Sequence, residues 1–334
     1  MNNKFWYVGA GHEVLAYLAN IKLRDFYLDP SSCAQSFRIG RKRIREIFGE
    51  EVTLPRVSGP ALSYGHIACL GAKIDFPEDS APGVKPIYSS IEEGIRFLKK
   101  KIEFEKNSLF QHYFKVCNHL QKEFPEEKVS FSGFGWEGPI TSAVLLRGQD
   151  FYIDIYDYPQ KVKEFLKLLT ESIIDFIHFT RKINKEPRIN PEGSGLCDDF
   201  SSLISPSLWP EFVIPYWKKY YKGITTGPRR IHCENLNPGH LKYLKMVSIV
   251  HYDPSVSLKL NPRVIRKNID IPFTWRLLSF QYSEMSKEDV RKWVYNSLKE
   301  GAARVSTIIE NIMCEDDNPE KVRTFIEAGS SLSH

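Results

Sequence analysis

The chain has 334 residues, of which 42% are hydrophobic and 26% charged, and its formal net charge is +5. These shares are typical of a globular protein with a sizeable core. The basic surplus is too small and too dispersed to favour nucleic-acid binding. The one dense basic run, Arg38 to Arg45, has the spacing of a solvated helix face, and a docking patch for an acidic partner is the less favoured interpretation.

No stretch reaches the roughly 20 apolar residues that a membrane-spanning helix needs, and residues 1–7 do not resemble a secretory signal. The six cysteines are scattered without the close spacing of a disulfide framework. We therefore expect a cytoplasmic protein that has no membrane contact and no structural disulfides.

In chain order, the segment before about residue 50 predicts helices around Leu15 to Leu23 and Ile39 to Phe48. Short apolar runs then alternate with amphipathic segments, as in repeated βα units. Helix starts are indicated by the capping box at Ser90, by Pro159, by Ser286 with Asp289, and by Asn318-Pro319. The expected strands are Ala61 to Ala68, Val129 to Gly133, Arg229 to Cys233, Val247 to Tyr252, Ile271 to Trp275 and Arg304 to Ile309.

This alternation predicts an α/β fold with one parallel sheet, either closed or open. No Gly-x-Gly-x-x-Gly or Walker-type motif follows an expected strand, so an open nucleotide-binding sheet is disfavoured. We expect a single domain over residues 1–334, a (β/α)₈ TIM barrel with a helical N-terminal extension of about residues 1–55.

Polar groups that follow apolar runs are the candidate functional residues, because barrels carry their sites at the carboxyl ends of the strands. Asp198 and Asp199 are adjacent carboxylates suited to substrate binding or acid/base work; the alternative is that one of them caps a helix, which leaves the other free. Asp253 ends another expected strand, although an Asp-Pro turn explains it equally well.

A second candidate is a metal site around His232. Side chains alternate along a strand, so His232 and Glu234 should face the same way and Cys233 the opposite way. Cys314 follows the last apolar run and could supply a third ligand. Imidazole, carboxylate and thiolate with one open position could hold a catalytic zinc ion, whereas a hydrogen-bonded His–Glu pair without metal is the structural alternative.

Several segments resemble the uroporphyrinogen decarboxylase superfamily. Gly138-Pro139-Ile140-Thr141, then Leu146-Arg147-Gly148 and Asp157-Tyr158-Pro159, resemble its Gly-Pro-hydrophobic-Thr, Leu-x-Gly and Asp-x-Pro pattern. Cys197-Asp198-Asp199 with Ser205-Pro206 and Phe212 to Tyr216 is similar to its Asp-Asp, Ser-Pro and Phe-x-x-Pro-Tyr segment. Gly71-Ala72-Lys73 with Pro77 is similar to its Gly-Ala-Lys stretch. The resemblance runs from about residue 15 to residue 328 and implies a single (β/α)₈ barrel.

Within this superfamily the residues favour the methyltransferase branch. Decarboxylases carry an N-terminal Arg-Gln-Ala-Gly-Arg element that grips substrate carboxylates, and the corresponding region here reads Leu28 to Cys33 without it. Methyltransferases bind zinc through His-x-Cys and a second, C-terminal cysteine, which the resemblance places at His232, Glu234 and Cys314. Glu234 stands where a cysteine is expected; Cys233 could replace it only if the strand were twisted or bulged.

The resemblance therefore implies a zinc-dependent methyltransferase that moves a methyl group from a small donor, such as a methoxylated aromatic, to the cobalt of a separate corrinoid protein. Asp198, Asp199 and Asp253 would orient the donor or protonate the leaving oxygen, and Trp136 and Tyr252 would wall the pocket. The alternatives are a methylcorrinoid:thiol methyltransferase and a metal-free protein that binds a tetrapyrrole or corrinoid. The sequence leaves a homodimer open.

Overall fold

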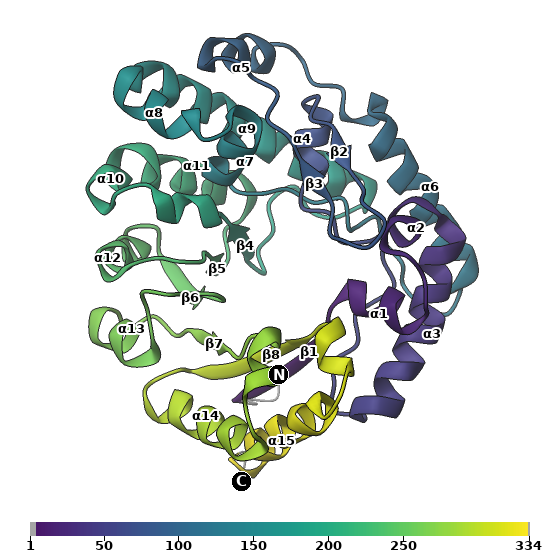
Figure 1. Cartoon of the computed structure of the whole chain (residues 1–334). Helices are drawn as coiled ribbons and strands as arrows, with labels where there is room; N and C mark the ends of the chain where they lie inside the picture. The colour runs from purple at the N-terminus through teal and green to yellow at the C-terminus, as the bar shows by residue number, and fades with distance from the viewer. Residues whose placement is uncertain (1–4, 333–334) are drawn as a thin grey trace.

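Strands and helices alternate along most of the chain, and the strands lie around a central space with the helices outside them (Figure 1). The structure is a computed structural model that describes residues 5–332. The strands are β1 (Trp6–Ala10), β2 (Ile74–Asp75), β3 (Gly83–Val84), β4 (Ser194–Cys197), β5 (Arg229–His232), β6 (Ile249–Asp253), β7 (Thr274–Arg276) and β8 (Arg304–Ile309).

Six of these strands form two parallel sheets, with the orders β1-β8-β7 and β4-β5-β6, and β2 and β3 form a small antiparallel pair. A single bridge between Tyr252 and Phe273 connects the end of β6 to the segment before β7. Another bridge joins Leu62 to Phe134. The fold is thus mixed α/β with parallel sheets, and in residues 5–332 the sheets are short and separate instead of one continuous eight-stranded sheet.

The helices are α1 (His12–Leu18), α2 (Leu23–Leu28), α3 (Pro30–Phe48), α4 (Gly65–Cys69), α5 (Ile91–Leu98), α6 (Ser108–Glu123), α7 (Pro139–Arg147), α8 (Asp150–Asp157), α9 (Pro159–Ile183), α10 (Trp209–Phe212), α11 (Ile214–Ile224), α12 (Pro238–Met246), α13 (Pro262–Asn268), α14 (Lys287–Lys299) and α15 (Asn318–Ser331). Short 3₁₀ helices include η2 (Asp199–Leu203) and η5 (Asn311–Cys314).

The predicted helix starts are confirmed. The Ser90 hydroxyl accepts a hydrogen bond from the Glu93 amide at the start of α5, and Ser286 and Asp289 form a reciprocal capping box at the start of α14. Pro159 opens α9, in which the apolar residues on one face are fully buried at helical spacing, namely Val162, Phe165, Leu166, Leu169, Ile173 and Ile177. Each of these signals is local, since a cap satisfies amide groups that the helix itself leaves unpaired.

The strand predictions were less accurate. Arg304–Ile309 is confirmed without change, and β5 and β6 lie within a residue or two of the expected ranges. The run Ala61 to Ala68 instead contains α4 after the bridge at Leu62, and Val129 to Gly133 is not a strand. A short buried apolar run is compatible with a helix or a strand, and periodicity alone does not separate them.

The N-terminal region is more than a helical extension. β1 begins at Trp6 and pairs in parallel with β8 over five residue positions, so the start of the described chain lies beside its end. Trp6 is 3% exposed and packs closely against Gly329 of α15. The sequence prediction missed this strand, whose pairing partner β8 lies at the other end of the described chain.

The surface features agree with a solvated exterior. In the basic run of α3, Arg38 pairs with Glu123 and Arg41 with Glu127, which fits the solvated helix face. None of the helices in residues 5–332 is long and apolar enough to cross a membrane. All six cysteines are free thiols.

Candidate metal centre

Three strand ends bring polar side chains to one place. In the parallel register of β4, β5 and β6, Cys197 pairs with His232, and His232 pairs with Asp253. Neighbouring strands lie about 4.8 Å apart, so side chains at these aligned positions that share a face are direct neighbours. The cluster is therefore a consequence of register.

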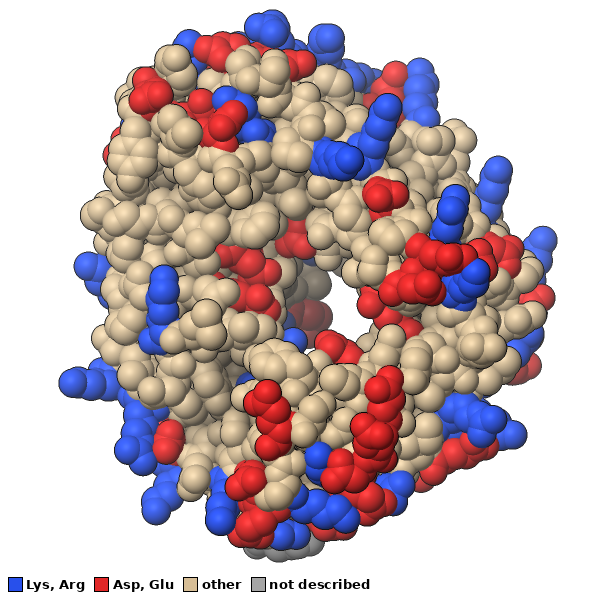
Figure 2. All heavy atoms as spheres, in the orientation of Figure 1, with Lys and Arg blue, Asp and Glu red and all other residues tan. Residues whose placement is uncertain are grey.

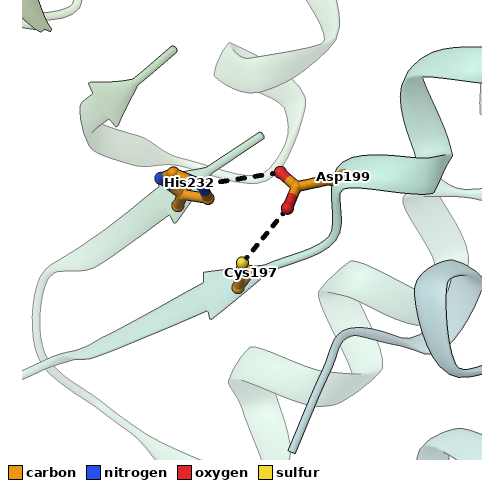
Figure 3. Close-up of side chains that lie close together, drawn as sticks. All are labelled: Cys197, Asp199 and His232. Carbon is orange, nitrogen blue, oxygen red and sulfur yellow. Dashed lines mark hydrogen bonds and ion pairs between the residues drawn. The ribbon is translucent and has the colours of Figure 1, made fainter. Parts of the chain in front are cut away.

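Cys197, Asp199 and His232 form a group able to hold a metal ion, with one ligand atom from each residue within 4.8 Å of the other two. The Cys197 thiol donates to Asp199 Oδ2 at 3.5 Å, and His232 Nε2 lies 3.6 Å from Asp199 Oδ1. Figure 3 shows the three side chains pointing toward one another from the ends of β4 and β5 and the start of η2. Within residues 5–332 it is the only such group of three.

Further charged groups surround His232. Its Nδ1 lies 3.0 Å from Asp253 Oδ2, and its Nε2 lies 3.6 Å from Glu234 Oε1. Arg276 donates to the same Asp253 oxygen at 2.9 Å. The imidazole is thus held on one side by a carboxylate that is itself fixed by an arginine, an arrangement that orients metal-binding histidines in many sites.

The carboxylates determine the charge of the imidazole in the metal-free protein. Burial alone would lower the pKa of His232, but the hydrogen bonds to Asp253 and Glu234 and the charge of Asp199 outweigh it and raise the pKa to about 10. Burial opposes ionisation of Asp253 as well, yet His232 and Arg276 lower its pKa. His232 is therefore an imidazolium at neutral pH when no cation replaces its proton.

Asp198 has a different role from its neighbour. Its carboxylate is fully buried and accepts hydrogen bonds from the Thr141 amide at 2.7 Å and from Trp217 Nε1 at 2.6 Å. Thr141 lies in the first turn of α7, where unpaired amides and the helix dipole favour a negative charge. Burial raises the pKa of Asp198 to about 6, against these hydrogen bonds. Asp198 thus joins the end of β4 to α7, and Asp199 is left to face His232.

Glu137 is a site residue that the sequence analysis did not single out. It is 9% exposed, and its Oε2 is buried without a hydrogen-bond partner in the described part of the chain. Burial, followed by the charge of Asp199, raises its pKa to about 8. It lies in the loop that precedes α7, and only its proximity to Cys197 and Asp199 in space distinguishes it from an ordinary loop carboxylate.

A cavity of about 550 Å³ extends from this cluster into the space between the strands. This volume is in the range of small-molecule sites. Trp136 lines the cavity and donates from Nε1 to the Tyr220 hydroxyl at 3.0 Å. Figure 2 shows the molecule hollowed at the centre of the viewed face, with acidic side chains around the hollow.

Tyr252, a predicted site residue, lies elsewhere. Tyr252 is fully buried among apolar residues and its hydroxyl donates to the Cys233 carbonyl, so it does not line the cavity; its placement as a pocket wall is corrected. The reason is strand alternation, because its neighbours His251 and Asp253 face the cavity. Cys233 is also buried away from the cluster, beside Ser201.

Cys314 is not part of the three-residue group. It ends η5, which follows β8 and packs against α1, and its Sγ lies 3.9 Å from the Glu310 carbonyl oxygen. The chain turns into this 3₁₀ helix directly after the strand, so the thiol is carried toward α1. The structure thus brings His232 and Glu234 together, as expected, but the sulfur atom of the candidate metal centre belongs to Cys197 and not to Cys314.

The donor set of the cluster fits zinc. A thiol, an imidazole and a carboxylate are the three ligand types that zinc takes in proteins, and three protein ligands with one open position are characteristic of catalytic sites. The unpartnered oxygen of Glu137 lies beside the same cluster. The fit rests on Cys197, Asp199 and His232, and Asp253 orients the imidazole through its contact with Nδ1.

These features define an α/β protein with a cavity between parallel strands and a candidate metal centre at their carboxyl ends. Residues 64–330 match the sequence family described as Uroporphyrinogen decarboxylase (URO-D), and the chain belongs to this family. Among solved structures it is similar to a methyltransferase from Methanosarcina mazei, with a TM-score of 0.68 and 14% sequence identity over 97% of this chain and 92% of that one. At this identity the likeness shows the fold. Comparison with curated proteins found no match.

Proposed function

We propose that this chain is a zinc-dependent methyltransferase that transfers a methyl group from a small donor to the cobalt of a corrinoid protein. The observation that carries the proposal is the Cys197–Asp199–His232 group beside a cavity of small-molecule size. Family membership and the structural likeness to a methyltransferase support it. We also infer that the ring of strands is a single-domain (β/α)₈ barrel and that the protein works in the cytoplasm.

In this proposal Cys197, Asp199 and His232 hold the zinc ion, and Cys197 takes the place that the sequence assigned to Cys314. Asp253 positions His232 through Nδ1, and Arg276 fixes Asp253. Glu234 lies next to His232 Nε2 and places a second carboxylate, besides that of Asp199, beside the proposed zinc site. Asp198 acts on the reaction only by fixing the end of β4. A bound zinc ion would supply Lewis acidity that stabilises negative charge on the donor's leaving oxygen.

The expected donor is a methoxylated aromatic compound. Its methyl group leaves the ether oxygen without the bonding electrons, and cobalt(I) of the partner protein supplies the pair for the new carbon–cobalt bond. The donor oxygen keeps the pair of the broken bond and takes up a proton. Trp136 lines the cavity in which the aromatic ring would bind.

The test compares two thiols. We expect about one zinc per purified chain, loss of that zinc in Cys197→Ser, and retention in Cys314→Ser, which serves as the matched control. A visible-spectrum assay of cobalt(I) cobalamin with methoxylated aromatics should show methylcobalamin with the wild type and with Cys314→Ser only.

Other outcomes separate the alternatives. Zinc loss in Cys314→Ser with retention in Cys197→Ser would contradict the ligand set. Methyl transfer from methylcobalamin to added thiols, without transfer from ethers, would assign the reverse direction. A metal-free wild type that still binds cobalamin would replace the enzyme with a binding protein.

A further inference from the structure

The cavity has a second layer of side chains toward the amino-terminal ends of the strands. Gly195 pairs in register with Arg230, and Arg230 pairs with His251. On the other side of the cavity Thr274 pairs with Arg304. All five residues line the cavity. Each lies two positions before another cavity-lining residue on the same strand, nearer its carboxyl end. Because side chains alternate along a strand, both sets of residues face the cavity.

This layer, which we call the arginine layer (Gly195, Arg230, His251, Thr274 and Arg304), carries positive charge without a counter-ion. Within residues 5–332, Arg230 and Arg304 make no ion pair or side-chain hydrogen bond. The cavity lining contains three arginines and one carboxylate, Asp253, and that carboxylate is already engaged by His232 and Arg276.

The remaining polar side chains of the arginine layer are uncharged hydrogen-bonding groups, a hydroxyl and an imidazole that is neutral at pH 7. His251 Nε2 lies 2.9 Å from the Thr274 hydroxyl. Burial, and then the charges of Arg304 and Arg230 against that of Asp253, lower the pKa of His251. The interiors of such parallel-stranded rings are ordinarily filled by branched apolar side chains. Arg230 and Arg304 are instead exposed in the lining of the cavity, so both guanidinium groups are accessible to a ligand.

The geometry points to the arginine layer as the subsite for a carboxylate of the methyl donor, with Arg230 and Arg304 as its ligands. This inference rests on the proposed function and adds the charge class of the substrate. Arginine is suited to this role because its planar guanidinium binds carboxylates through two parallel hydrogen bonds.

The spacing of the two layers agrees with a single aromatic ring. Arg230 and His232 are two residues apart on β5, about 6–7 Å along the strand. A benzene ring with para substituents spans a comparable length. A carboxylate held by the arginine layer would therefore place a para-methoxy group near Cys197, Asp199 and His232.

The test uses a shape-matched ligand pair that differs in charge, 4-methoxybenzoate and 4-methoxybenzamide, with binding measured by calorimetry on the purified protein. We expect the carboxylate to bind roughly tenfold more tightly than the amide, as for a charge-assisted hydrogen bond of moderate exposure. Arg230→Gln and Arg304→Gln should each remove most of this preference, and added salt should weaken carboxylate binding alone.

The matched control is Arg263→Gln, which removes one positive charge from exposed α13, outside the cavity. It should keep the wild-type preference. Inorganic phosphate is a second probe: phosphate binding that depends on Arg230 and Arg304, without a carboxylate preference, would overturn the carboxylate assignment. Equal binding of acid and amide by the wild type would overturn the inference as a whole.

These experiments distinguish a failure of the carboxylate subsite from a failure of the proposed methyltransferase function. Demethylation of both compounds at equal efficiency would leave the methyltransferase standing and overturn the carboxylate subsite. Arginine-dependent carboxylate binding by a protein without zinc or methyl transfer would do the reverse. Zinc content and thermal unfolding of each variant check that the metal centre and the fold are intact.

Discussion

At the scale of single residues, the metal-free cluster holds protons that a metal ion must displace. The pKa of His232 is about 10, and burial followed by the charges of Glu137 and Asp199 raises the pKa of Cys197 far above its usual range. Zinc binds the neutral imidazole and the thiolate. The same groups that assemble the site therefore make its occupancy depend on pH.

We predict that zinc affinity rises steeply from pH 6 to pH 9 and that binding at pH 8 releases about two protons per chain. A pH indicator in weakly buffered solution measures the release. Asp253→Asn should lower the pKa of His232 and reduce the release, because the carboxylate that favours the imidazolium is gone. Zinc affinity that is independent of pH would contradict this account.

In the metal-free protein, the stability of the fold changes with pH in the opposite direction to the affinity for zinc. Since the pKa of folded His232 exceeds its ordinary value of 6.5, the protonated ring stabilises the fold below about pH 6.5, and this contribution is lost as the pH rises toward 10. The protein without zinc is thus expected to lose stability in the range where zinc binds best.

Glu137 gives a second pH-dependent prediction. Its folded pKa of about 8 lies above the ordinary 4.5, so the native state keeps a proton that the unfolded chain releases, and stability falls as the pH rises from about 4.5 to 8. In chelator-treated protein, Glu137→Gln should raise the Tm above that of the wild type at pH 8, with a smaller gain toward pH 4.5. The exposed Glu126→Gln is the control; equal shifts in both variants would contradict the prediction.

At the scale of elements, the contact between β4 and α7 depends on a missing side chain. Gly138 donates its amide to the Cys197 carbonyl at 2.6 Å, and a Cβ added there would lie 2.4 Å from Asp198 Cγ. The buried Asp198 carboxylate can reach the α7 amides only because this position is a glycine.

We therefore expect Gly138→Ala to destabilise the protein by about 1–3 kcal/mol, as overpacking commonly does, and to weaken zinc binding through displacement of the Cys197–Asp199 segment. Gly83→Ala is the control, because nothing lies within 4 Å of the added Cβ, and its effect should stay within about 0.5 kcal/mol. Chemical denaturation of both variants measures the difference. Equal stability would show that the helix moves without cost.

Elements with strong local signals could be predicted from the sequence. Ser90, Ser286 and Pro159 fix helix starts through their own hydrogen bonds or dihedral angles. The strand Arg304–Ile309 is long enough to be recognised. β4 was missed because it has four residues, Ser194 and Gly195 among them, and its pairing with β5 comes from a segment more than 30 residues away.

The candidate site was predicted in part. Alternation on β5 separated His232 from Cys233, and the structure places them in different surroundings. The sulfur ligand could not be predicted in this way. Cys314 follows an apolar run, whereas Cys197 follows the turn-rich stretch Gly193 to Leu196, and only the register of β4 against β5 brings Cys197 beside His232. The register between strands this far apart in the sequence depends on how the segment between them folds, which the residues of either strand alone do not show.

At the scale of the whole molecule, β1 and β8 hold the two ends of the described chain together. Trp6 on β1 is buried against α15, whereas its neighbour Phe5 is 49% exposed. Substituting each of these adjacent aromatic residues in turn distinguishes the stability that comes from packing β1 on α15 from the general effect of removing a ring.

Trp6→Ala should cost about 3–5 kcal/mol of stability, as for a large buried ring, while Phe5→Ala should cost less than about 1 kcal/mol. The free energy of unfolding in urea measures both changes. Similar values for the two variants would mean that the packing of β1 on α15 adds little to the fold.

The pairing of β1 with β8 also bears on how the protein is made. The partner of the second residue of β1, Ser306, is translated 299 residues after Tyr7, so a nascent chain carries an unsatisfied strand edge until β8 has been made. Contacts this distant in sequence form slowly, and an unpaired edge invites association with other chains. Production should therefore benefit from chaperones that shield the unpaired β1 edge of the nascent chain.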